Sequence, residues 1–194
     1  MKKIFVLLII IVSINAFGQQ KYDYYNGQRF IKKAEKNISK GKFEKALRLL
    51  SKAEQSNYGF CGSGNYSTLK NIEHLKINSF LGLKEYDSIL AILEQKELYF
   101  EFEAKKDDSL KVEILFLKFG NENVINSFKK STNLLRKTSI YNDFFNYTLF
   151  LEDLNYTLSF KKKNNKYNKI EFENETNIES ICKNTLFYNL IFED

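Results

Sequence analysis

The hydrophobic pattern in the first third of the chain predicts two amphipathic helices joined by a short turn. Between residues 43 and 53, apolar side chains recur every three or four positions and so share one helix face: Phe43, Ala46, Leu47, Leu50 and Ala53. Upstream, Phe30, Ala34 and Ile38 form a matching stripe. We therefore expect a hairpin of two antiparallel helices whose apolar faces meet, with alanines at the contact allowing close approach of the backbones.

Helical spacing returns twice further along the chain. The next stripe comprises Leu69, Ile72, Leu75, Ile77 and Phe80, with Ser67 or Thr68 as its N-cap. A turn over residues 82–86 leads to a partner stripe of Ile89, Leu90, Ile92 and Leu93. A fainter third pair comprises Leu110, Ile114, Leu115 and Leu117, then a turn at Gly120, then Val124, Ile125 and Phe128. The glycine-rich stretch 57–67 is expected to be a loop between the first two pairs.

The order of small and large residues in the first pair resembles the tetratricopeptide repeat. In that family an aromatic opens the first helix, a small residue follows one turn later, and a Gly-x-aromatic turn leads to alanines in the second helix. The matching positions here are Phe30, Ala34, Gly41, Phe43, Ala46 and Ala53. The family's closing proline is absent, because the chain contains no proline. An ordinary amphipathic hairpin is the alternative interpretation.

The resemblance implies a role in binding another protein or a peptide. In the family, the first helix of each pair lines a concave surface. Alignment on Phe43 and Tyr86 assigns six residues to that surface: Gln28, Ile31, Glu35, Asn71, His74 and Asn78. The amides and the imidazole could bond a peptide backbone, and Ile31 would add an apolar contact. The alternative is that His74 and its neighbours form a plain solvated helix face.

After Lys137 the pattern changes from helical spacing to alternation, which indicates strands. Three such segments occur, centred on Leu149, Leu158 and Glu171, and we expect an antiparallel meander in which Phe160 pairs with Ile170 and Leu158 with Phe172. Residues 144–154 could instead be helical. A last helix, with Ile178, Ile181, Cys182 and Leu186 on one face, would cover the sheet. The predicted fold class is α+β, mainly α: helical hairpins, a small β-meander and a C-terminal helix.

The first residues have the three parts of a secretory signal peptide. Lys2 and Lys3 are followed by the apolar run Ile4–Val12 and then by small residues at Ala16 and Gly18. We expect cleavage after Gly18 and a periplasmic or secreted bacterial protein with no stable membrane anchor; an uncleaved anchor is the alternative. The expected organisation is a signal peptide at 1–18, helical repeats at 19–137 and a sheet-plus-helix unit at 138–194.

Charge and reactive residues narrow the function classes further. The net charge of +6 becomes +4 when Lys2 and Lys3 are removed, and this mild excess gives little support to nucleic-acid binding. His74 is the only histidine, and the chain has no nucleophile, phosphate-loop or dinucleotide motif, so we expect no enzyme, metal or cofactor. The acidic pairs at 107–108 and 152–153 are typical of turns and caps.

Two cysteines, Cys61 and Cys182, are present in a chain that we expect to be exported. An oxidising compartment favours a disulfide between them, while the alternative is that Cys182 is a small buried apolar residue. Together these patterns predict an exported scaffold or adaptor that binds a protein or peptide through helical repeats. A secreted enzyme or inhibitor accessory that acts through the C-terminal sheet is the second hypothesis.

Overall fold

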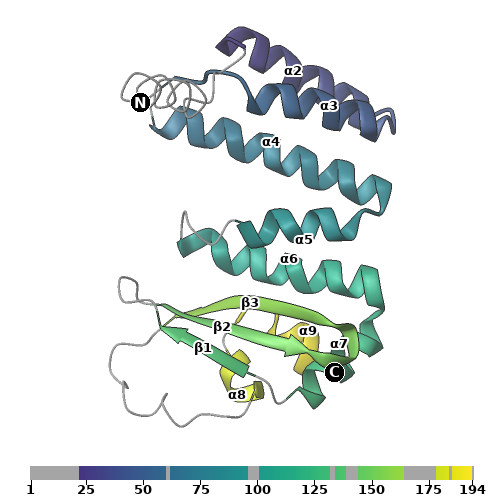
Figure 1. Cartoon of the computed structure of the whole chain (residues 1–194), viewed down its shortest axis with the longest axis vertical. Helices are drawn as coiled ribbons and strands as arrows, with labels where there is room; N and C mark the ends of the chain where they lie inside the picture. The colour runs from purple at the N-terminus through teal and green to yellow at the C-terminus, as the bar shows by residue number, and fades with distance from the viewer. Residues whose placement is uncertain are drawn as a thin grey trace, which may run out of the picture. The chain divides into compact units, whose positions relative to one another are not determined.

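A computed structural model describes residues 22–59, 62–95, 101–131, 134–138, 144–163, 178–183 and 185–193. The fold is α+β and mainly α, as predicted (Figure 1). It divides into two compact units, Met1–Lys84 and Glu85–Asp194. The predicted signal peptide at 1–18 lies outside the described residues.

The first unit contains α2 (Tyr24–Ile38), α3 (Phe43–Glu54) and α4 (Gly62–Leu83). Asp23 caps α2, because its Oδ1 accepts a hydrogen bond from the Asn26 N–H at 2.7 Å. The chain reverses at Gly41, whose φ of +67° suits glycine. α2 and α3 then pack against each other, so the predicted first hairpin is confirmed, and α4 packs on both of them.

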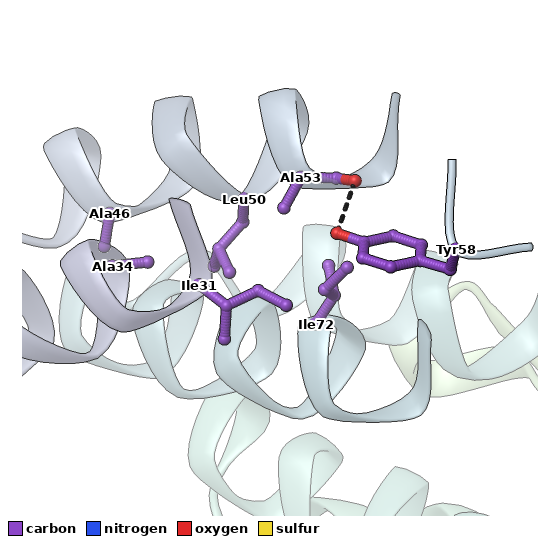
Figure 2. Packing of buried hydrophobic residues seen from close by; sticks show 7 residues of the cluster. All are labelled: Ile31, Ala34, Ala46, Leu50, Ala53, Tyr58 and Ile72. Carbon is purple, nitrogen blue, oxygen red and sulfur yellow. Dashed lines mark hydrogen bonds between the residues drawn. The ribbon is translucent and has the colours of Figure 1, made fainter. Parts of the chain in front are cut away.

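The core of this unit is the predicted apolar stripe extended by residues from beyond the hairpin. Figure 2 shows its buried members: Ile31, Ala34, Ala46, Leu50, Ala53, Tyr58 and Ile72. The Tyr58 hydroxyl donates to the Ala53 carbonyl at 2.8 Å, which satisfies a carbonyl near the C-terminal end of α3. The three alanines are fully buried, as expected for residues at a close helix contact.

The loop predicted at 57–67 is shorter than expected. α4 begins at Gly62, so neither Ser67 nor Thr68 is its N-cap, and Leu69 is 42% exposed although the stripe predicted it in the core. Gly62 and Gly64 lie in the first turn of the helix, where N–H groups have no intrahelical partner and a poor helix former disturbs few bonds. The glycine signal therefore marked the start of the helix as well as the loop.

In the second unit, α5 (Tyr86–Gln95), α6 (Glu101–Phe119) and α7 (Asn121–Lys130) follow one another. α5 packs against α6 and α6 against α7, with Gly120 at a φ of +86° between the last two. The predicted apolar residues Ile89, Leu90 and Leu93 of α5 are buried. Leu117 is 58% exposed, which contradicts its predicted place in the core.

The sheet has three described strands in the order β1-β2-β3: β1 (Leu134–Thr138), β2 (Phe144–Leu151) and β3 (Tyr156–Lys163). The second and third match the predicted alternating segments, and Tyr147 pairs with Phe160 and Leu149 with Leu158 on the buried face. The helical alternative for 144–154 is wrong, apart from the short 3₁₀ turn η2 (Glu152–Leu154). β1 was not predicted, and the expected strand at 170–172 lies outside the described residues.

The chain ends in two short helices, α8 (Ile178–Cys182) and α9 (Tyr188–Phe192), instead of one. Leu186 is therefore off the predicted face and is 53% exposed, while Phe187 and Ile191 are buried. The Phe187 ring packs edge-on against Phe160 of β3, with centroids 5.3 Å apart, and lies 6.1 Å from the Phe128 ring of α7. Phe187 therefore packs on the apolar face of the sheet at Phe160.

Candidate functional site

The candidate partner-binding residues lie on α2 and α4, so the packing of these helices decides where the side chains point. α2 is held close to the segment after α3: the Asn57 N–H donates to the Tyr22 carbonyl at 2.8 Å, and Tyr22 and Ser56 form a parallel bridge. A Cβ added to Gly27 would lie 2.5 Å from the Tyr58 hydroxyl oxygen and 2.7 Å from Ser56 Cβ. Glycine at this position therefore sets the close approach of α2.

α4 presents a polar face formed by Asn71, His74 and Asn78, which are all exposed. Their spacing of three and four residues brings the side chains together on one side of the helix. Ile72 on another side of α4 belongs to the core of the first unit, which fixes the rotation of the helix about its axis. Lys76 Nζ also donates to Glu54 Oε1 of α3 at 2.9 Å and ties α4 to its neighbour.

On α2, Gln28 is half-buried and Glu35 is exposed, and a spacing of seven residues puts both on one side of the helix. No hydrogen bond or ion pair within the described part of the chain joins these two side chains to the polar face of α4. α2 and α4 are nevertheless in contact along the unit.

The predicted role of Ile31 as an apolar contact for a partner is wrong. Ile31 is 3% exposed and packs in the core with Leu50 and Ile72 (Figure 2). Gly27, four residues before it, and Ala34, three residues after it, are buried as well, because α2 must bury one side against both α3 and α4. The candidate surface therefore consists of five polar residues without an apolar centre.

The second unit contains a buried ion pair that the sequence analysis missed. Lys111 Nζ lies 3.3 Å from Asp108 Oδ1 and donates to the Ser159 carbonyl of β3 at 2.8 Å. Both charged side chains are almost fully buried. Asp107 and Asp108 lie inside α6, so the interpretation of this acidic pair as turn and cap residues is wrong. Glu152 and Asp153 do form the turn between β2 and β3.

A second polar contact joins β3 to α5. The Tyr156 hydroxyl donates to Glu94 Oε1 at 2.7 Å. Burial raises the pKa of Tyr156 well above its usual value, and the hydrogen bond to Glu94 raises the pKa further because it needs the protonated phenol. At neutral pH the contact is therefore a stable donor–acceptor pair, and its geometry indicates a structural role.

The second hypothesis assigns the activity to the surface of the C-terminal sheet. Its described side chains include Thr148, Thr157 and Phe150, which is 36% exposed. Carboxylates do not converge under the sheet in the described residues apart from Asp108, which pairs with Lys111. Nor do three or more His, Cys, Asp or Glu side chains in this part of the molecule form a group that could hold a metal ion.

Cys182 is fully buried on α8, as its alternative interpretation expected. Cys61 lies outside the described residues, so the pairing of the two cysteines stays a prediction.

Comparison with known proteins found no relative of this chain. The chain matches no protein-family model, no curated protein and no solved structure. Across the residues that the structure describes, no helix is both long and apolar enough to cross a membrane.

Proposed function

We propose that the chain is an exported module that binds a protein or peptide through a tetratricopeptide-like arrangement of helices. The observation that carries this proposal is the exposed polar face of Asn71, His74 and Asn78 on a helix that packs against both members of a helical hairpin. Repeat proteins of this kind bury each hairpin against the next and leave the first helix of each pair free to contact a ligand.

The side chains on this face suit an extended peptide. Two amides and an imidazole supply both donors and acceptors, which match the alternating N–H and C=O groups of a peptide backbone. Gln28 adds another amide from α2, and Glu35 adds a carboxylate that would favour a basic residue in the partner. Because the helices that carry these groups are already packed in place, binding would lose little backbone conformational entropy.

The test compares the wild-type chain with the double variant His74→Ala and Asn78→Ala. Each is immobilised and exposed to envelope extract from the native host, and the retained proteins are quantified by mass spectrometry. The control variant, Asn126→Ala and Lys129→Ala, removes two exposed side chains from α7. We expect the affinity of a retained partner to fall by about thirtyfold in the His74 and Asn78 variant only, since two hydrogen-bonded contacts contribute about 1 kcal/mol each.

Thermal melts of both variants should stay close to wild type, because surface substitutions of this kind change stability by about 0.5 kcal/mol or less. Equal retention of every protein by the double variant and the wild type would place the binding surface elsewhere and overturn the proposal.

A further inference from the structure

The positive charge of the chain is concentrated in its first hairpin. Residues 22–59 contain nine Lys and Arg and four Asp and Glu, a net charge of +5. Residues 60–194 contain 18 basic and 20 acidic residues, a net charge of −2. The hairpin is therefore strongly basic, although the average over the whole chain is mild.

Seven of these basic side chains are exposed along the outer sides of the hairpin and are here together called the basic face. Its members are all exposed and come from both helices of the hairpin: Arg29, Lys32, Lys33, Lys36, Lys45, Arg48 and Lys52. Lys52 of α3 lies over the Phe30 ring of α2, with Nζ 6.0 Å from the ring centre, so a basic side chain of α3 reaches across to α2. Within the described part of the chain, none of the seven pairs with a carboxylate.

An exposed aromatic residue lies on the same side of α2. Tyr25, Arg29, Lys32 and Lys36 follow one another at steps of four, three and four residues, so they form a single stripe along the helix. The stripe is about 16 Å long at 1.5 Å per residue. Tyr25 is 83% exposed, which is unusual for a large aromatic side chain on a packed helix.

We propose that the basic face binds the surface of a bilayer that contains anionic phospholipid. Its charges are spread along the outer sides of two helices and do not converge on a point, so they match a plane of phosphate groups better than a single anion. Clusters of four to eight Lys and Arg on a helix are typical of such binding. Tyrosine, with an apolar ring and a polar tip, suits the headgroup layer.

The position of the hairpin in the sequence supports a lipid partner. Eleven residues separate the apolar run Ile4–Val12 from the start of α2. An apolar run of this kind directs a chain to a membrane, and the hairpin contains the first described helices after that run. The binding proposed here is reversible and electrostatic, and it requires no helix that crosses the bilayer.

The test measures co-sedimentation with vesicles. Residues 19–194 are used, because the apolar run before them would itself enter lipid, and this chain retains every described element. Vesicles of phosphatidylcholine mixed with phosphatidylglycerol are compared with vesicles of phosphatidylcholine alone. We expect binding to the anionic vesicles only, and we expect it to weaken as salt is added, since the Debye length falls to about 8 Å at physiological ionic strength.

Two variants with the same change in net charge test whether the basic face is responsible for vesicle binding. The variant Arg29→Gln, Lys32→Gln and Lys36→Gln should lose more than tenfold in partition coefficient, because each basic residue near an anionic surface contributes up to about fivefold. The control Lys84→Gln, Lys129→Gln and Lys183→Gln has the same change in net charge on exposed residues elsewhere and should lose far less. Circular dichroism and melting temperature show that both variants fold. Equal losses in the two variants would overturn the proposal.

Tyr25→Gln separates a lipid surface from other polyanions. It should weaken vesicle binding several-fold, with a loss that remains at high salt, where the charge contribution is screened. Double-stranded DNA and polyglutamate are added as competitors. If either binds as tightly as the anionic vesicles and is insensitive to Tyr25→Gln, the face is a general polyanion or acidic-protein site and the lipid assignment is wrong.

Discussion

At Gly27 the backbone of α2 passes so close to Ser56 and Tyr58 that a side chain has no space. This contact could not be predicted from the sequence, because glycine inside a helical pattern usually indicates only weak helix propensity. Ile31 shows the same limit: its spacing assigned it to a helix face, but only the packing of α4 shows that this face is buried. By contrast, Asn71, His74 and Asn78 are exposed as expected, because polar side chains at helical spacing rarely lie inward without partners.

Gly27→Ala tests this close contact. At an open helix position this change stabilises a protein by about 1 kcal/mol, because alanine is the better helix former. Here the added methyl would press on Ser56 and Tyr58, and we expect a loss of about 1–3 kcal/mol in the free energy of unfolding. Urea denaturation measures it, with Lys33→Ala on the same helix as a control that should change stability by about 0.5 kcal/mol or less. A stabilised Gly27→Ala variant would contradict the close contact.

Among the elements, those with long and regular apolar spacing were predicted best. α3, α5 and the two strands β2 and β3 were found from their periods, because each element buries one continuous face. β1 was missed, since Leu134–Thr138 has two adjacent leucines and then charges, with no alternation, and forms a strand through its pairing with β2. The prediction of a single C-terminal helix was wrong because it took no account of Phe187. This residue lies between the two helices, as the N-cap of α9, and packs against Phe160.

The buried ion pair on α6 gives a prediction about the sheet. In the described sheet β3 is an edge strand, and Lys111 satisfies its Ser159 carbonyl while pairing with Asp108. Lys111→Met should destabilise the chain by about 3–5 kcal/mol, because it removes one charge of a buried pair and the donor to the Ser159 carbonyl.

Lys118 supplies a matched control seven residues later on the same helix. It pairs with Asp87, whose side chain is largely exposed, so Lys118→Met should cost about 1 kcal/mol or less. Chemical denaturation of the two variants under one set of conditions gives the comparison. Similar losses in the free energy of unfolding of both variants would show that the buried Lys111 pair contributes no more to stability than the exposed Lys118 pair.

For the whole molecule, the fold class followed from counting periodic segments, whereas the organisation into two units did not. The predicted boundary at 137–138 followed the change from helical spacing to alternation. α5, α6 and α7 group with the sheet because α6 packs against β3 and also against both α5 and α7. The sequence already contains the difference in net charge between the first hairpin and the rest of the chain. A single net charge for the whole chain conceals that difference. A count per predicted element would have found it.

Alkaline pH should destabilise both units. Burial is the first cause of a raised pKa at Tyr58 in the first unit and at Tyr156 in the second. A tyrosine whose pKa is higher in the folded state contributes stability that is complete below about pH 10, the pKa in the unfolded chain, and is lost as pH rises towards the folded value.

Thermal melts between neutral pH and pH above about 10 should therefore show falling stability. Tyr156→Phe removes the ionisable group from the second unit and should make the fall shallower, although the variant starts from a lower stability because the bond to Glu94 is lost. A slope as steep as that of the wild type would mean that Tyr156 ionises equally in the folded and unfolded chain.

α2 carries two different surfaces, since neighbouring residues point about 100° apart around the helix. Gln28 and Glu35 lie on one side, and Arg29, Lys32 and Lys36 lie about a quarter of a turn away. A protein bound to a membrane through the basic residues would diffuse in the plane of the membrane. Gln28 and Glu35 would then face along that plane, towards molecules beside the protein. Partners that are themselves confined to that plane would then be met far more often than partners in free solution, so the arrangement of one helix would select among ligands by where they reside.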